Sequence, residues 1–250
     1  MDFQQTVIEK YRLPEEVDFY TRQAEAGLTA EEEKLLSAFL PPRADILDLG
    51  CGAGREAFPL ARAGHRVTGA DISPELIRAG EERAGKSGLQ VRFRLIRPGD
   101  SLPFPDKSFQ AVLMLSQLLG HIQGRANRLD YLKEARRTAG PGGLLFASVH
   151  DRSGCAWDEW RKLQIPTEQG GEEGDIWIDQ ISDQPTPGRM YFHLYGGAEI
   201  IRDLRDSGWE ILHWWAADEA PPGEEPAVWD RFLYLAAQKP DPLFWKVAAQ

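Results

Sequence analysis

A glycine-rich turn directly after a short apolar run constrains this chain more than any other feature of its sequence. The apolar run is Ile46–Leu49, and the turn reads Gly-Cys-Gly-Ala-Gly over residues 50–54. Glycine allows the backbone to bend sharply and leaves no Cβ between the main chain and a ligand. A strand followed by such a turn and then a helix is typical of α/β proteins, which bind ligands at the carboxyl ends of parallel strands.

Apolar runs and amphipathic stretches alternate along the following hundred residues. A capping box that begins at Thr29 predicts a helix before Pro41, and Ser73 predicts the start of a second helix. The pattern predicts an α/β fold with a doubly wound, Rossmann-like sheet that is mostly parallel and has helices on both faces. The expected strands are 46–49, 66–71, 91–94, 109–115 and 144–149, and the expected helices between them are 56–63, 74–84 and 128–138.

Charge is divided unevenly along the chain. Residues 1–150 carry equal numbers of acidic and basic side chains, so the formal net charge of −10 comes from residues 151–250. Because an acidic surface repels phosphate backbones, we do not expect nucleic acid as a partner. The sequence has no secretion signal, too few cysteines for a disulfide framework, and no apolar run of the ~18 residues that would span a membrane. These observations predict a cytoplasmic protein without a membrane partner.

Three charged residues around the glycine turn indicate the kind of ligand. Arg55 stands where a dinucleotide fingerprint requires glycine or alanine, which disfavours a nicotinamide site. Asp48 precedes the turn, where a carboxylate disfavours a pyrophosphate but suits an ammonium group. Asp71 ends the second expected strand, where its carboxylate can accept hydrogen bonds from both ribose hydroxyls. The ligand expected from these acids is a nucleoside with a positively charged tail and no phosphate.

Four segments, in order and correctly spaced, resemble the class I S-adenosylmethionine-dependent methyltransferase family (type 11/25-like). They are the glycine-rich motif at 48–54, the ribose motif at 67–73, the entry to the fourth strand at 102–112 and the turn into the fifth at 136–143. The runs 209–214 and 231–237 look like the antiparallel C-terminal hairpin of that fold. The resemblance covers roughly residues 40–150. It implies S-adenosylmethionine as the cofactor, S-adenosylhomocysteine as the product, and no metal.

The resemblance also implies a set of cofactor-binding residues. Asp48 either contacts the ammonium group or orients the turn, and Asp71 holds the ribose. The family often has an acid at the position of Pro98; here either Asp100 or main-chain groups of residues 99 and 100 are expected to hold the adenine. Cys51 is interpreted as a small packing residue within the turn. The full expected set is Asp48, Gly50, Cys51, Gly52, Asp71, Ile72, Gly99, Asp100, Ser116 and Gln117, the last two beside the sulfonium and the substrate.

Residues beyond the fourth and fifth expected strands are candidates for the acceptor side. His121 follows the fourth strand and is either a general base or a packed histidine. We expect a helical cap over residues 1–40 and a methyltransferase domain over 41–250. The acidic, aromatic stretch 151–195 is expected to form a lid or insertion, or else a satellite core. The substrate-binding candidates are Tyr11, Tyr20, His150, Trp157 and His193.

The most consistent interpretation is a methyltransferase that acts on a small-molecule acceptor by in-line displacement. One alternative is a tRNA wobble-uridine methyltransferase, which residues 189–195 faintly resemble but which the acidic second half disfavours. Another is a cofactor-binding protein without turnover, and a further one is a nicotinamide-dependent oxidoreductase. The sequence does not give the identity of the acceptor or the oligomeric state.

Overall fold

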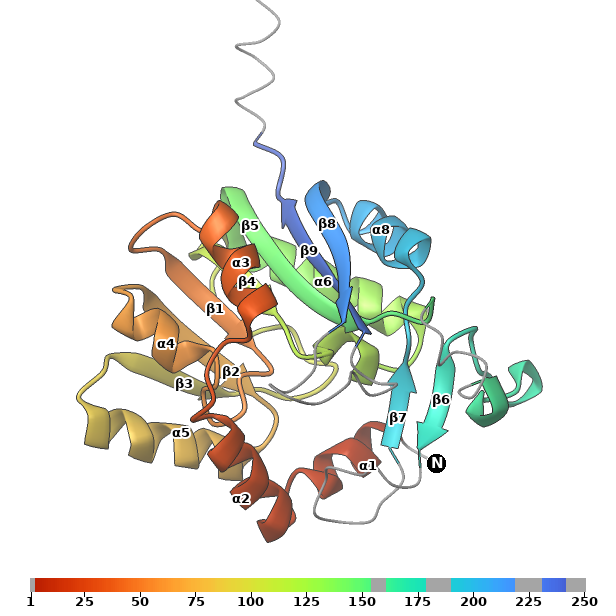
Figure 1. The fold of residues 1–250 in the computed structure, drawn as a ribbon, viewed down its shortest axis with the longest axis horizontal. Helices are drawn as coiled ribbons and strands as arrows, with labels where there is room; N and C mark the ends of the chain where they lie inside the picture. Colours follow the sequence, from red (N-terminus) through yellow and green to blue (C-terminus); the bar gives the residue numbers. More distant parts are fainter. Residues whose placement is uncertain (1–2, 154–160, 179–189, 219–230, 242–250) are drawn as a thin grey trace, which may run out of the picture.

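The computed structural model describes residues 3–153, 161–178, 190–218 and 231–241. Within these ranges the chain forms a seven-stranded sheet in the order β3-β2-β1-β4-β5-β9-β8 and a separate two-stranded sheet, β6-β7 (Figure 1). The strands are β1 (Asp45–Leu49), β2 (Arg66–Asp71), β3 (Val91–Leu95), β4 (Phe109–Met114), β5 (Ala139–His150), β6 (Asp175–Ile178), β7 (Met190–His193), β8 (Glu210–Asp218) and β9 (Arg231–Gln238).

Strands β1 to β5 are parallel, whereas β9 is antiparallel to both of its neighbours, β5 and β8. This arrangement confirms the predicted mixed sheet and its antiparallel C-terminal hairpin. The strand order reverses at β1, which pairs with β2 on one side and β4 on the other. Ligands of open α/β sheets lie beyond the carboxyl ends of the strands at such a reversal. The loops after Leu49 and Met114 are therefore where a site is expected.

Helices cover both faces of the large sheet. Alternate residues of each strand face opposite sides; thus Ile46 packs with α3 and α4 on one face, and Leu47 with α6 and α8 on the other. No helix in the described ranges is both long and apolar enough to cross a membrane. The helices are α1 (Phe3–Lys10), α2 (Pro14–Gln23), α3 (Ala30–Phe39), α4 (Ala57–Arg62), α5 (Pro74–Ser87), α6 (Arg125–Thr138) and α8 (Gly197–Asp206), and the 3-10 turns are η1 (Leu118–His121), η2 (Arg161–Leu163) and η3 (Thr167–Gln169).

Local sequence signals set the start of two of these helices. The Thr29 hydroxyl accepts a hydrogen bond from the Glu32 N–H (3.2 Å), and the Glu32 carboxylate accepts one from the Thr29 N–H (2.9 Å). This is the predicted capping box of α3. The Ser73 hydroxyl likewise accepts from the Leu76 N–H (3.2 Å) at the start of α5. These contacts confirm two helix starts that the sequence predicted.

Contacts with distant parts of the chain move two other boundaries. Helix α6 begins at Arg125 rather than at the expected Arg128, and the Arg125 N–H donates to the Glu172 carboxylate (2.7 Å). Strand β5 begins at Ala139, before the expected turn at residues 141–143, and its register with β4 shifts there. Nothing near residue 125 in the sequence shows that Glu172 meets this helix.

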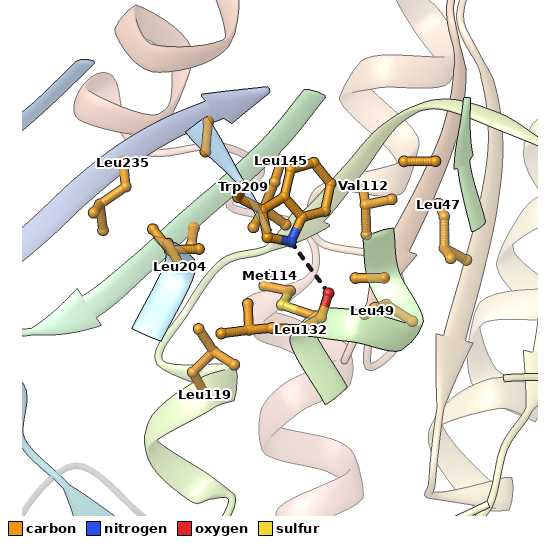
Figure 2. Packing of buried hydrophobic residues seen from close by; sticks show 14 of the residues in the cluster. Leu47, Leu49, Val112, Met114, Leu119, Leu132, Leu145, Leu204, Trp209 and Leu235 are labelled. Atoms are coloured by element: carbon orange, nitrogen blue, oxygen red, sulfur yellow. Dashed lines mark hydrogen bonds between the residues drawn. The ribbon is translucent and has the colours of Figure 1, made fainter. Parts of the chain in front are cut away.

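The core of the large sheet is closed on the α6 and α8 side by an aromatic side chain. Trp209 is fully buried just before β8, and its indole N–H donates to the main-chain carbonyl of Leu132 in α6 (3.1 Å; Figure 2). A buried indole that keeps its hydrogen bond adds a large apolar area without an unsatisfied polar group. This packing joins the C-terminal hairpin to the helix layer.

The N-terminal helices and the β6-β7 hairpin meet at the ligand side of the sheet. Helix α1 lies next to β7 (Figure 1), and Tyr11, just after α1, packs against the small apolar cluster that the hairpin forms. That cluster contains Ile176, Ile178, Met190, Phe192 and Leu194. Helix α3, in contrast, packs its Leu35 and Leu36 directly on the large sheet. Within residues 1–40, therefore, α1 is the helix that contacts the hairpin.

Candidate functional site

The glycine turn follows β1 and has two glycines with different roles. Gly50 has φ +72°, and a Cβ added there would lie 2.9 Å from the Leu118 Cδ1 atom of η1. Gly52 has φ +52°, but an added Cβ would meet no atom closer than 4.0 Å. At Gly50 the positive φ favours glycine and an added Cβ would have to displace the Leu118 side chain, whereas at Gly52 the backbone is bare on an open side.

Asp71 lies at the end of β2, and its carboxylate holds the turn in place. One oxygen accepts a hydrogen bond from the Gly52 N–H (2.8 Å), and the other accepts one from the Ser73 N–H (2.9 Å). Burial raises the pKa of Asp71 above its usual value, although these N–H groups act in the opposite direction. A carboxylate oxygen has more than one lone pair. Asp71 can thus orient the turn and still accept bonds from a ligand.

A group of charged side chains, which we call the loop cluster, surrounds the turn: Glu32, Asp48, Arg55, Glu56 and Asp71. Arg55 donates to both oxygens of Glu32 (2.7 and 2.8 Å) and to Glu56 (2.5 Å). It also donates to the Ser116 hydroxyl. Glu32 thereby serves both as the capping residue of α3 and as the partner of the arginine that follows the turn.

Asp48 is the least satisfied member of the loop cluster. Its side chain is buried, and its Oδ2 atom has no hydrogen-bond partner among the described residues. Burial, followed by the negative charge of Glu56, raises the pKa of Asp48 well above its usual value. Because the cluster sets four carboxylates against one guanidinium, it favours the approach of a further positive charge.

Ser116 and Gln117 follow β4 and both adopt left-handed backbone conformations, with φ values of +51° and +65°. The Gln117 side-chain amide donates to the His193 carbonyl (2.9 Å) and accepts from the His150 N–H (2.6 Å). Ser116 lies at the loop cluster through Arg55, whereas the buried Gln117 amide is engaged by the chain itself. Gln117 therefore ties the ends of β5 and β7 to the loop after β4.

His121 ends η1 and belongs to a connected group of rings that we call the aromatic cluster: Tyr11, Tyr20, His121, His150 and Phe192. The centroid of the His121 ring lies 4.8 Å from that of Phe192 and 6.4 Å from that of Tyr11. The Tyr11 and Tyr20 centroids are 5.2 Å apart, and those of His150 and Phe192 are 6.4 Å apart. Four of the predicted acceptor-side residues thus form a connected group of rings with Phe192, which the sequence analysis did not single out.

His193, another predicted substrate residue, has a different environment. Its ring is fully buried, and its two nitrogens lie 2.6 Å from Asp175 and 3.1 Å from Glu199. Burial alone would lower the pKa of His193, but the hydrogen bonds to these carboxylates outweigh it and raise that pKa. Both ring nitrogens are used by the chain, so the side chain has none left for a substrate.

His193 belongs to a second charged group, the hairpin cluster, in which each carboxylate meets a cationic partner. Arg128 is fully buried and pairs with Glu172 (2.5 Å), and Arg152 pairs with Glu199. Glu172, His193 and Glu199 lie close enough together to suggest a metal site. The two arginines already neutralise both glutamates, however, which disfavours a metal ion there. The cluster consists of Arg128, Arg152, Glu172, Asp175, His193 and Glu199.

The remaining predicted residues lie around these groups. Cys51 is buried against Phe58 and Phe93, as expected of a packing residue. Ile72 packs partly against the core next to the buried Leu102, whereas Gly99 and Asp100 are exposed in the loop between β3 and β4. Trp157 lies outside the described residues.

Two members of the loop cluster, Glu32 and Glu56, are not among the residues that the sequence predicts at the site. The available signal is Arg55, because an arginine that packs next to a glycine turn needs carboxylate partners. The hairpin cluster left no comparable signal, because its residues are scattered over residues 128–199.

Comparisons with known proteins agree with this architecture. A family model described as "Methyltransferase domain" matches residues 46–143. A ubiquinone biosynthesis O-methyltransferase of Cereibacter sphaeroides is 34% identical over 141 residues, which are 56% of this chain and 53% of the relative. A demethylmenaquinone methyltransferase of Tropheryma whipplei is 42% identical over 142 residues, 56% of this chain and 48% of the relative. The chain thus spans about half the length of the curated relatives it matches.

A solved structure gives the same result for the fold. A SAM-dependent methyltransferase from Methanosarcina mazei superposes with a TM-score of 0.71 at 23% identity, covering 86% of this chain and 99% of the other. At this identity the likeness shows the fold alone. Residues 46–143, which contain the glycine turn, thus match a methyltransferase domain, and the seven-stranded sheet has the fold of class I S-adenosylmethionine-dependent methyltransferases.

Proposed function

We propose that this protein transfers a methyl group from S-adenosylmethionine to a small-molecule acceptor. The observation that carries the proposal is the loop cluster, in which buried carboxylates exceed cations and the Asp48 Oδ2 atom has no partner among the described residues. S-Adenosylmethionine carries an ammonium and a sulfonium and no phosphate. Its charge therefore matches what the cluster lacks.

The residues at the turn fit this cofactor. The open side of Gly52 lets the methionine portion approach the main chain, with Asp48 at its ammonium group. Asp71 keeps free lone pairs for the ribose hydroxyls. Ile72 offers an apolar surface for the adenine, whose edge is then left to main-chain groups of residues 99 and 100.

When bound, the cofactor supplies an activated methyl group on a good leaving group, so the chain's own task is to bind, orient and exclude water. Asp71 fixes the turn through the Gly52 N–H, and Arg55 fixes Ser116 against the same turn. Gln117 holds the ends of β5 and β7 beside that position. These contacts keep the edges of the site in one arrangement, which in-line displacement requires.

The acceptor side favours a small molecule over tRNA. Residues 190–195, part of the stretch that faintly resembled a tRNA methyltransferase, are all buried and offer no surface to a nucleic acid. The ubiquinone and demethylmenaquinone methyltransferases among the relatives also carry names that indicate small-molecule acceptors.

Calorimetric titration with S-adenosylhomocysteine and with NAD tests the proposal. We expect the first to bind and the second not to. Gly52→Asn should abolish the binding, because asparagine tolerates a φ near +52° while its side chain enters the open side of the turn. Gly88→Asn is the matched control: Gly88 ends α5 with φ +69° and has no atom within 4 Å of an added Cβ. Unaltered binding by Gly52→Asn, or binding of NAD alone, would contradict the proposal.

A further inference from the structure

On the acceptor side of the site, His121 has a ring nitrogen without a hydrogen-bond partner. This nitrogen, Nδ1, is buried, and nothing among the described residues bonds to it. A neutral imidazole has one protonated nitrogen and one nitrogen that can accept a hydrogen bond. A buried acceptor without a partner is costly in a folded protein. It is therefore a candidate for contact with a ligand.

The rings of the aromatic cluster come from separate parts of the fold. Phe192 belongs to β7, Tyr11 follows α1 and Tyr20 lies in α2. His150 ends β5, and its ring lies 4.2 Å from that of Phe232 in β9. Flat side chains around one polar atom favour a flat ligand with one matching polar group.

The aromatic cluster is continuous with the proposed cofactor site. The main-chain carbonyl of Tyr11 accepts a hydrogen bond from the Ser73 hydroxyl (3.2 Å), and Tyr11 packs beside Ala53 of the glycine turn. On the other side, the Gln117 amide holds the His150 N–H. A ligand among these rings would therefore lie next to the residues assigned to the cofactor.

We propose that the methyl acceptor is a planar aromatic molecule with a hydroxyl group, and that His121 Nδ1 accepts the hydrogen bond from that hydroxyl. This inference rests on the proposed function and specifies its substrate class. His121 acts here by binding and orienting the hydroxyl, and no proton transfer to it is required.

The charge state of the site agrees with an uncharged hydroxyl donor. Burial lowers the pKa of His121 to about 4, so the ring is neutral at pH 7 and can accept a hydrogen bond. A neutral imidazole gives a carboxylate-bearing ligand no ion pair, and the nearby carboxylate of Asp71 disfavours an anion. A phenolic hydroxyl satisfies Nδ1 without bringing a negative charge.

The test compares 2-naphthol with 2-methoxynaphthalene, which has the same ring but cannot donate a hydrogen bond. Both are titrated at pH 7 into the protein saturated with S-adenosylhomocysteine. We expect 2-naphthol to bind about five- to tenfold more tightly, the value of one hydrogen bond. The ¹⁵N resonance of His121 Nδ1 should shift with 2-naphthol and not with the ether.

His121→Gln is the informative variant, because it removes the acceptor at the δ position and keeps a polar side chain of similar length. We expect it to bind the two naphthalenes equally. His213→Gln, on the exposed side of β8, should keep the wild-type preference. If His121→Gln does not fold, the ¹⁵N shift of the wild-type protein with 2-naphthol tests the role of His121.

An unchanged preference in a folded His121→Gln variant, or no ¹⁵N shift with 2-naphthol, overturns the role of His121. If S-adenosylhomocysteine binds but neither naphthalene does, the aromatic acceptor class is wrong while the proposed function stands. If S-adenosylhomocysteine itself does not bind, the proposed function fails instead.

Discussion

The loop cluster and the hairpin cluster are both buried groups of charged side chains, yet their charge balance is opposite. The loop cluster sets four carboxylates against Arg55 and leaves Asp48 Oδ2 without a partner among the described residues. In the hairpin cluster, Arg128, Arg152 and the imidazole of His193 face three carboxylates. Burying a charge costs several kcal/mol unless it is paired. The balanced group therefore stabilises the fold, whereas the unbalanced one is suited to a cationic ligand.

This contrast predicts the largest effect on stability in the hairpin cluster. His193→Ala should lower the free energy of unfolding by about 3 kcal/mol, because Asp175 and Glu199 lose the ring between them while other partners remain. Urea unfolding measures this change, with His213→Ala as the exposed control. A folded His193→Ala should still bind S-adenosylhomocysteine. If it instead loses binding at full stability, the hairpin cluster is part of the ligand site.

The pH dependence of the same transition gives a second readout of His193. Because its folded pKa is raised, the imidazolium stabilises the folded protein fully below its unfolded pKa of about 6.5. This contribution is lost as the pH rises through the folded pKa. The wild-type free energy of unfolding should therefore decline over that range more than in His193→Ala. Parallel profiles would show that His193 is not charged in the folded state.

A smaller effect, on binding rather than on stability, is expected at Asp71. Asp71→Ala should weaken S-adenosylmethionine binding by about 1–3 kcal/mol, since the ribose hydroxyls and the Gly52 N–H lose their acceptor. Calorimetry measures this loss, and Asp130→Ala, on the exposed face of α6, is the control. Unchanged affinity would remove Asp71 from the site.

The smallest effect concerns the protonation of Asp48. Burial and then Glu56 raise its pKa, and a cation beside it favours the ionised form, so binding of S-adenosylmethionine should release a proton. Affinity should therefore increase with pH until Asp48 is ionised in the free protein. Titrations in two buffers of different ionisation enthalpy count the protons. Asp48→Asn should abolish the release, and Asp45→Asn, at the exposed start of β1, should not. Equal proton release from the wild-type protein, Asp48→Asn and Asp45→Asn would show that a group other than Asp48 titrates.

Much of the fold could be predicted from the sequence because its signals are local. The capping box at Thr29 and the helix start at Ser73 appear as predicted, since each depends on residues three positions apart. The alternation of short strands with helices predicts a parallel sheet even when the contacts between distant residues are unknown. The end of β2 at Asp71 is likewise confirmed, because the strand pattern of residues 66–71 is local.

The side-chain partners that the sequence did not reveal depend on contacts between distant residues. Gln117 is expected beside the sulfonium and the substrate, and in the structure its amide bonds to the main chain at residues 150 and 193. His193 was expected at the substrate, but β7 turns its ring toward Asp175 and Glu199. Neither orientation follows from local propensity, because a side chain's partner depends on which strand packs beside it.

The sequence alone therefore determined the class of fold, the position of the glycine turn and the acids that flank it, since these follow from backbone conformation and the periodicity of apolar residues. Only the tertiary structure decided which buried charges are balanced and which are not. That balance depends on residues far apart in the sequence, such as Glu32 and Glu56, which the fold brings to the same arginine, Arg55. This charge balance distinguishes the loop cluster, the candidate ligand site, from the hairpin cluster, which stabilises the fold.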